Sequence, residues 1–200
     1  MCADELKSSA PRAQRVLTRN LPQNYHPTRA GVIPYTVSSD RSRIFYLCID
    51  ANYGDLTNAS GGTGTSESPI IGAVRELYEE TIGIFDFRNA IETIQNQSVS
   101  IYTPRELIII QPVRLDTRPA QVCHHYRELY RSALDLGVDN RHIESAYLVY
   151  ISEENLLALI RGETVSIPED LRSLDGIKAT YPPLYHRLRG ILNTTGTELF

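Results

Sequence analysis

The sequence predicts an α+β fold in which helices surround a mixed β-sheet. Short apolar runs between turn residues, such as "AGVIPYTV" (30–37) and "RIFYLCID" (43–50), are typical of strands. A longer segment (119–136) repeats apolar residues at helical spacing. Strands and helices follow one another without strict βαβ alternation, which favours a mixed sheet over a parallel one.

The composition limits the classes of protein that this chain can represent. Its 200 residues, 42% hydrophobic and 22% charged, suit one globular domain of moderate size. A formal net charge of -4 disfavours nucleic-acid binding by bulk charge, without excluding a nucleotide reached through bridging cations. Cys2, Cys48 and Cys123 lack C-x-x-C spacing, which favours a reducing, intracellular and cytoplasmic location. No apolar run approaches the length of a membrane span, and the first 15 residues contain no apolar segment of the kind found in export signals, so we expect no membrane partner.

The elements are expected in a simple order along the chain. Residues 1–28 are polar and interrupted by prolines, so they are expected to form an N-terminal arm, with a short helix over 12–19, before a domain at 29–200. The two strands named above should form a hairpin. Further strands are expected at 98–104, 106–115 and 144–151, and further helices at 119–136, 152–162 and 182–193.

The stretch "SGGTGTSESPIIGAVRELYEETIGIF" (60–85) carries the chemistry. Ser68 is a good N-cap and Pro69 suits the first helical position, which predicts a helix from there to about residue 82. At 100° per residue, its glutamates at 76, 79 and 80 share one stripe bordered by apolar and small residues. Such like charges repel by roughly 0.2–0.5 kcal/mol per exposed pair, and a single arginine at 75 cannot neutralise them. A hard divalent cation, Mg²⁺ or Mn²⁺, is therefore the expected counter-charge.

The same stretch resembles the Nudix box, G-x5-E-x7-R-E-U-x-E-E-x-G-U, where U is apolar. Gly61, Glu67 and the run from Arg75 to Glu80 stand at the required spacings. Chance agreement at all of these positions is a poor explanation, although the match covers only about an eighth of the chain. One departure is clear, because the terminal glycine of the pattern falls on Ile82 and a glycine follows only at Gly83.

The resemblance implies a Nudix-like α/β/α sandwich with a central mixed sheet, and a hydrolase that acts on phosphoanhydride bonds. It also implies a role for each matching residue. Glu79 and Glu80 would be the principal metal ligands, and the Gly61 carbonyl would add an oxygen. Glu76 would bind the metal or accept a proton from water, with Arg75 orienting the glutamates. The implied catalytic set is Glu76, Arg75 and Glu79, and the implied metal set is Glu76, Glu79, Glu80, Gly61 and Glu144.

Residues outside the helix are weaker candidates. Glu144 opens the strand at 144–151 and is the candidate for a further metal-binding carboxylate, with an exposed strand-edge glutamate as the alternative and Glu106 as a rival. Glu67 would brace the loop against the helix or contact substrate. Tyr102 is similar to a tyrosine that marks dinucleoside polyphosphate hydrolases, and Arg127 belongs to a basic, aromatic cluster that could touch phosphate. Ordinary strand packing for Tyr102, and core packing with a solvated arginine face for the cluster, are the more common explanations.

Together these observations predict a pyrophosphohydrolase that depends on Mg²⁺ or Mn²⁺ and cleaves a diphosphate linkage in a small nucleoside diphosphate derivative. An mRNA-decapping enzyme, with capped RNA as partner, and a diphosphoinositol-polyphosphate hydrolase are the alternatives within the same family. A nucleotide-binding Nudix module without catalysis is the alternative from another class. The sequence leaves a homodimer open.

Overall fold

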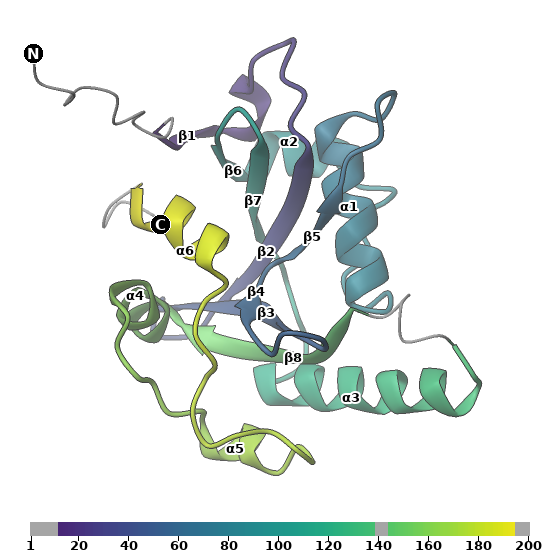
Figure 1. The fold of residues 1–200 in the computed structure, drawn as a ribbon, viewed down its shortest axis with the longest axis vertical. Helices are drawn as coiled ribbons and strands as arrows, with labels where there is room; N and C mark the ends of the chain where they lie inside the picture. The colour runs from purple at the N-terminus through teal and green to yellow at the C-terminus, as the bar shows by residue number, and fades with distance from the viewer. Residues whose placement is uncertain (1–11, 139–143, 195–200) are drawn as a thin grey trace, which may run out of the picture.

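The fold is known from a computed structural model that describes residues 12–138 and 144–194 (Figure 1). The strands are β1 (Gln14–Leu17), β2 (Arg29–Val37), β3 (Arg43–Asp50), β4 (Leu56–Thr57), β5 (Ala59–Gly62), β6 (Val99–Tyr102), β7 (Glu106–Pro112) and β8 (Ser145–Ser152). The helices are η1 (Thr18–Asn20), α1 (Pro69–Glu80), α2 (Ile91–Gln97), α3 (Pro119–Asp135), α4 (Glu153–Arg161), α5 (Glu169–Arg172) and α6 (His186–Thr194).

One mixed sheet forms the centre of the described part of the chain. Its main path runs β1-β6-β7-β2-β3-β4, with β5 also paired to β2 and β8 also paired to β3. The β2–β7 pair is parallel, and the other pairs are antiparallel. On its other edge β2 pairs first with β5, over Arg29–Val32, and then with β3, over Tyr35–Val37. The sheet therefore divides beside β2, and β5 brings the glycine-rich loop to that point.

Helices cover both faces of this sheet. In Figure 1, β2 and β7 run between α1 on one side and α4 and α6 on the other, while α3 lies along β8. Fully buried strand residues such as Ile33, Leu47 and Ile109 form the core with Leu77 of α1. Burying each such side chain contributes roughly 1.5–3 kcal/mol, which holds α1 against the sheet. The expected class, helices around a central mixed sheet, is confirmed.

Helix α1 begins where the sequence predicts. The Ser68 hydroxyl accepts a hydrogen bond from the Ile71 N–H at 3.4 Å, and Pro69 takes the first helical position. The buried face comprises Ile70, Gly72, Ala73, Val74, Leu77 and Glu80. Five of these residues are apolar or small, so the burial of the sixth, a glutamate, needs a specific explanation.

Several elements differ from the expectation. The helix expected over 12–19 is wrong in part, because Gln14–Leu17 form strand β1, which pairs with β6. Strands β4 and β5 and helix α2 were not expected at all. β5, with the sequence ASGG, has no strand propensity of its own, and it extends because its backbone pairs with β2. The division into an arm (1–28) and a domain (29–200) stays a prediction.

Two observations bear on the environment of the chain. No helix of the described residues is both long and apolar enough to cross a membrane. Cys48 and Cys123 are free thiols and both are buried. Burial raises the pKa of each thiol well above its ordinary value, which keeps these two cysteines chemically inert. The third cysteine lies outside the described residues.

Candidate active site

Three elements meet at the C-terminal end of α1. The buried Tyr126 of α3 donates its hydroxyl proton toward the Glu80 carbonyl oxygen at 3.2 Å and the Ser145 carbonyl oxygen at 2.5 Å. This side chain joins the last turn of α1 to the first residue of β8. Glu144 precedes β8 directly, so the same contact keeps it near the glutamates of α1.

Arg75 is the centre of an ion-pair cluster on α1. Its Nε lies 3.2 Å from Glu67 Oε1, and its Nη1 lies 2.7 Å from Glu76 Oε1 and 3.1 Å from Glu79 Oε2. Its Nη2 donates to the Gly62 carbonyl at 3.0 Å. One guanidinium thus fixes three carboxylates and the end of β5, which suits its rigid fork of donors. Hydrogen bonds from Arg75 lower the pKa of Glu67, which also accepts from the Gly64 N–H at 3.3 Å.

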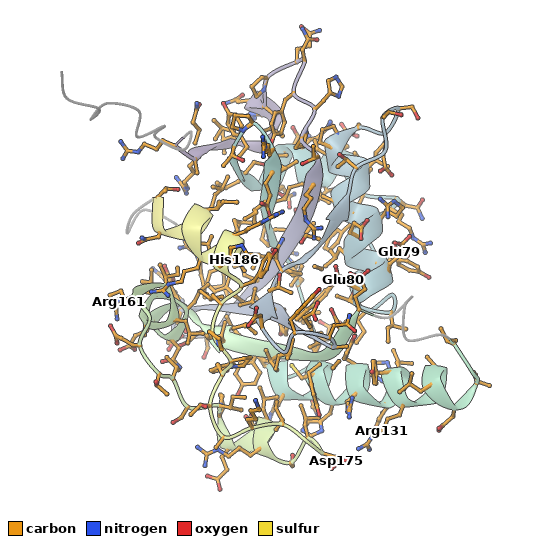
Figure 2. The ribbon with its side chains drawn as sticks, in the orientation of Figure 1. Glu79, Glu80, Arg131, Arg161, Asp175 and His186 are labelled. Atoms are coloured by element: carbon orange, nitrogen blue, oxygen red, sulfur yellow. The ribbon has the colours of Figure 1, made fainter. Side chains whose placement is uncertain are left out.

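Glu80 has a different environment. It is 7% exposed, and its carboxylate accepts from the Ser60 N–H at 2.9 Å and from the Ser145 hydroxyl at 2.8 Å. Both donors are neutral. The pKa of Glu80 is raised to about 8, chiefly by burial and also by the nearby Glu144 and Glu76, while the hydrogen bonds from the two donors oppose the rise. Figure 2 shows Glu80 on the sheet side of α1 and Glu79 on its outer side.

Glu76 stands between these two environments. Burial raises its pKa, Arg75 opposes the rise, and Glu79 and Glu144 add to it. Its carboxylate lies directly against the backbone of Gly61, where the Cβ of any other residue would overlap it. The glycine is needed there because it lets β5 approach the carboxylate.

The structure therefore brings the predicted metal set into one neighbourhood without closing it around an ion. Glu76, Glu80 and Glu144 influence one another electrostatically, and Gly61 contacts Glu76. Over residues 12–138 and 144–194, no three acidic, histidine or cysteine side chains are close enough together to form a ready-made metal centre. The oxygen-rich donor set is nevertheless of the type that Mg²⁺ and Mn²⁺ prefer.

The exit from α1 contains the departure from the Nudix pattern. Position 82 has φ +51° although it is isoleucine, and Gly83 has φ +77°. The backbone thus keeps a left-handed conformation where the pattern has its glycine, with strain at Ile82 because its side chain is β-branched. The Gly83 N–H closes the turn on the Tyr78 carbonyl at 2.8 Å. The glutamates upstream of this turn remain in helical register.

A cavity of about 170 Å³ opens beside Glu80, where the sheet divides next to β2. It is lined by Arg29, Asp50, Tyr53, Asp55, Thr57, Asn58, Ser60, Glu80, Glu144 and Tyr185. Arg29 is the one lysine or arginine among these residues, and its Nη2 donates to the Ser60 carbonyl at 2.9 Å. Because the Ser60 N–H holds Glu80, Arg29 also supports that carboxylate through the β5 backbone.

The other predicted residues do not line this cavity. The Tyr102 hydroxyl donates to Gln14 Oε1 at 2.8 Å, so it connects β6 to β1. The Arg127 guanidinium lies 4.4 Å from the Tyr147 ring centroid, and its Nη1 donates to the Ala146 carbonyl at 3.0 Å. The Tyr102 contact matches the strand-packing alternative. Arg127 is half-buried, and its buried Nε has no hydrogen-bond partner among the described residues, so it does not lie on a solvated arginine face. Glu106 lies opposite Arg29 in the β2–β7 register, outside the cavity.

Sequence reasoning missed most of the cavity wall. Arg29, Asp55 and Tyr185 come from separate elements, and no fixed spacing in the sequence relates them. The segment "DANYGD" (50–55) offers a local signal, since Asp, Asn and Gly close together favour a tight turn. That signal predicts the turn without indicating what it faces.

No protein-family model matches the chain, and no curated protein matches it. Among solved structures, it is similar to a Nudix hydrolase from M. smegmatis, RenU, at 15% identity and a TM-score of 0.41, covering 85% of this chain and 87% of that one. It is similar to the C. elegans Ap4A hydrolase at 11% identity and a TM-score of 0.40, covering 86% and 97%. A binary complex of that hydrolase matches at 16% identity and a TM-score of 0.30, covering 45% and 70%. Similarity at this level establishes neither family membership nor activity, so a functional assignment must come from the site itself.

Proposed function

We propose that this chain is a divalent-metal-dependent pyrophosphohydrolase of the Nudix kind that cleaves a diphosphate linkage in a nucleoside diphosphate derivative. The observation that carries the proposal is Glu80. Glu80 is 7% exposed, accepts hydrogen bonds only from neutral donors among the described residues, and lies near two further glutamates, so within that part of the chain its carboxylate has no ion-pair partner. Folded proteins rarely bury a carboxylate in this way unless a proton or a cation neutralises its charge.

A Mg²⁺ or Mn²⁺ ion would complete this site. Glu76, Glu79, Glu80 and Glu144, with the Gly61 carbonyl, would hold the ion, which would supply Lewis-acid stabilisation of a diphosphate and lower the pKa of a bound water. The Glu80 carboxylate would then exchange its proton for the ion.

The residues of the chain divide the remaining tasks. Arg75 holds Glu76 Oε1, which leaves Oε2 free to accept a proton from an attacking water. Its raised pKa makes Glu76 a better base than a solvent-exposed glutamate. A new bond forms between the water oxygen and phosphorus, the phosphoanhydride P–O bond breaks, and the leaving phosphate carries away the bonding electrons.

Arg29 would approach the substrate from the cavity side. It is half-buried, and within the described residues only its Nη2 makes a hydrogen bond, which leaves Nε and Nη1 for a phosphate oxygen. An intracellular, reducing location, in keeping with the free buried thiols, is part of the same proposal.

The test is a product-mass screen of the purified chain with Mg²⁺ or Mn²⁺. The panel comprises dinucleoside polyphosphates, nucleotide sugars, ADP-ribose, diphosphoinositols and capped RNA, and the last two represent the alternatives within the family. We expect a phosphomonoester product, and a fall in kcat of about 100-fold or more in Glu79→Gln. The matched control is Glu92→Gln, an exposed change on α2 that should leave turnover unchanged.

Two results would overturn the proposal. Turnover of no panel member would leave only the binding-module alternative, and unchanged turnover in Glu79→Gln would remove the glutamates from the chemistry. A steep loss of activity with rising salt would instead favour capped RNA over a small substrate, because contacts to a nucleic-acid backbone weaken steeply with salt.

A further inference from the structure

The mouth of the cavity carries an aromatic side chain that the proposed chemistry does not use. Tyr53 is 84% exposed, which is unusual for a tyrosine in an otherwise well-packed domain. Its turn is rigidly built, because Asp50 Oδ1 accepts from the Asn52 and Tyr53 N–H groups at 2.7 Å each. The Gly54 N–H closes the turn on the Asp50 carbonyl at 3.0 Å. The turn fixes the backbone that carries this ring, and the exposed ring offers a face on which a planar ligand can stack.

The part of the wall that contains Tyr185 is also held by backbone hydrogen bonds. The Tyr185 N–H donates to the Leu56 carbonyl at 2.8 Å, and the Leu56 N–H donates to the Pro183 carbonyl at 2.9 Å. The ring of Tyr185 packs edge-on against His186, with 4.5 Å between the centroids. The segment that leads into α6 is therefore attached to β4, which positions Tyr185 in the wall.

Two polar side chains in this wall lack partners. Asn58 is only 2% exposed, yet its Nδ2 has no hydrogen-bond partner in the part of the chain that the structure describes. The Asp55 carboxylate is half-buried and accepts no hydrogen bond from any described residue. Native structures satisfy nearly all buried polar groups, so the unpartnered Asn58 amide is the exception in this wall. The partly exposed Asp55 carboxylate in the same wall is free to accept hydrogen bonds from a ligand.

The chemistry of Asp55 limits the kind of ligand that this cavity can recognise. A carboxylate only accepts hydrogen bonds, so it favours a base edge with two adjacent N–H donors. Guanine has this edge in its N1–H and 2-amino groups. Adenine and cytosine have a ring-nitrogen acceptor beside their amino group, and uracil has a carbonyl oxygen on each side of its N–H. In each of these bases an acceptor atom would therefore face, and repel, one oxygen of the carboxylate.

We propose that the cavity is the base-recognition subsite, in which a guanine base stacks on Tyr53 and donates its N1–H and 2-amino hydrogens to Asp55. Arg29 and Glu80 border the same cavity, so a diphosphate attached to this nucleoside would extend toward the glutamates. The inference rests on the proposed function only in assigning the bound nucleoside to the substrate. The recognition itself needs neither metal nor hydrolysis.

The test uses nucleosides, which carry no phosphate and so report on the cavity alone. Guanosine, inosine, adenosine and cytidine are titrated into the full chain in the presence of EDTA, with ligand-observed NMR as the readout. We expect guanosine to bind about tenfold more tightly than adenosine or cytidine, with inosine between them because it lacks the 2-amino group. Asp55→Asn should remove this preference, whereas Asp116→Asn, an exposed aspartate outside the cavity, should keep it.

A second pair of variants tests the stacking. Tyr53→Ala should weaken the binding of every nucleoside by about tenfold, and Tyr53→Phe should bind each nucleoside as tightly as the wild type does. Because Tyr53 is exposed, both variants should melt at the wild-type temperature, which checks that they fold.

Equal binding of all four nucleosides, no binding at all, or a guanosine preference that survives Asp55→Asn would overturn the inference. Hydrolysis in the screen above, without base preference here, would overturn this inference and leave the proposed function standing. Selective guanosine binding without hydrolysis of any panel member would support this inference and overturn the proposed function.

Discussion

Two neighbouring parts of the glutamate cluster differ in how they are held. Glu67, Glu76 and Glu79 share the guanidinium of Arg75, and the Glu79 side chain is 51% exposed. Glu80, the next residue along the chain, is 7% exposed and, among the described residues, accepts hydrogen bonds only from neutral donors. The first part resembles a surface ion-pair network, whereas the second is a buried acid whose pKa is about 8. The site therefore combines a half that Arg75 preorganises with a half, around Glu80, that still needs positive charge.

The largest expected effect comes from displacing a preorganised carboxylate. In Gly61→Ala the new Cβ would overlap the Glu76 carboxylate, which must rotate away and lose its contact with Arg75. Displacement by about 1 Å can cost roughly 100-fold in rate, so we expect kcat to fall by about that factor. The mobile end of a glutamate can move at little cost in stability. Gly62→Ala is the matched control, because its Cβ would meet nothing within 4 Å, and equal losses of activity in the two variants would contradict this account.

A smaller effect is expected from replacing the guanidinium. Arg75→Lys keeps the charge but cannot reach Glu67, Glu76, Glu79 and the Gly62 carbonyl at once. We expect turnover to fall about tenfold and the free energy of unfolding, from urea titration, to fall by about 1 kcal/mol. Arg131→Lys is the control, because that exposed arginine pairs with one carboxylate among the described residues, that of Asp175 at 2.9 Å. Both residues are labelled in Figure 2. If Arg75→Lys behaves like Arg131→Lys, the cluster is an ordinary surface network.

The smallest effect concerns stability and pH at Glu80. Its pKa is raised from 4.5 to about 8, so the fold favours the protonated acid. Protonation therefore stabilises the fold fully below about pH 4.5, and this contribution is lost as the pH rises toward 8. Glu80→Gln keeps a neutral side chain that can satisfy Ser60 and Ser145. In EDTA, we expect the variant to exceed the wild type in unfolding free energy by about 1 kcal/mol or more above pH 8, and by little near pH 5.

Urea titrations at several pH values give this measurement, with Glu92→Gln as the control that alters an exposed glutamate only. A gap between Glu80→Gln and the wild type that stays constant with pH would show that Glu80 is ionised in the fold at all of them. The burial of Glu80 beside neutral donors would then need a different explanation.

The sequence predicted the fold well where a pattern is local. Ser68 and Pro69 marked the start of α1, and strands β2, β3, β7 and β8 followed from their apolar runs. It failed for β1 and β5, whose residues become strands only because β6 and β2 supply backbone partners far away in the chain. Local propensity does not encode such pairing.

The site divides in the same way. Glu76, Glu79 and Glu80 lie on one helix, so their spacing alone was enough to group them, and the contact of Arg75 with Glu79 follows from that spacing. The contacts of Arg75 with Glu67 and the Gly62 carbonyl depend on how the preceding loop folds back onto the helix. Arg29, Asp55 and Tyr185 meet Glu80 through the division of the sheet beside β2, which no stretch of sequence shows. The left-handed backbone at Ile82 was likewise hidden, because isoleucine gives no signal for it.

Binding of a divalent cation by the glutamates of α1 can be measured without any substrate. Mn²⁺ is titrated into the wild type, Glu79→Gln, Glu80→Gln and the control Glu92→Gln, and binding is followed by water-proton relaxation or calorimetry. We expect stoichiometric binding in the wild type and the control, with a loss of affinity of at least about tenfold in each of the other two variants. Absence of Mn²⁺ binding in the wild type, or equal affinity in all four proteins, would contradict this expectation.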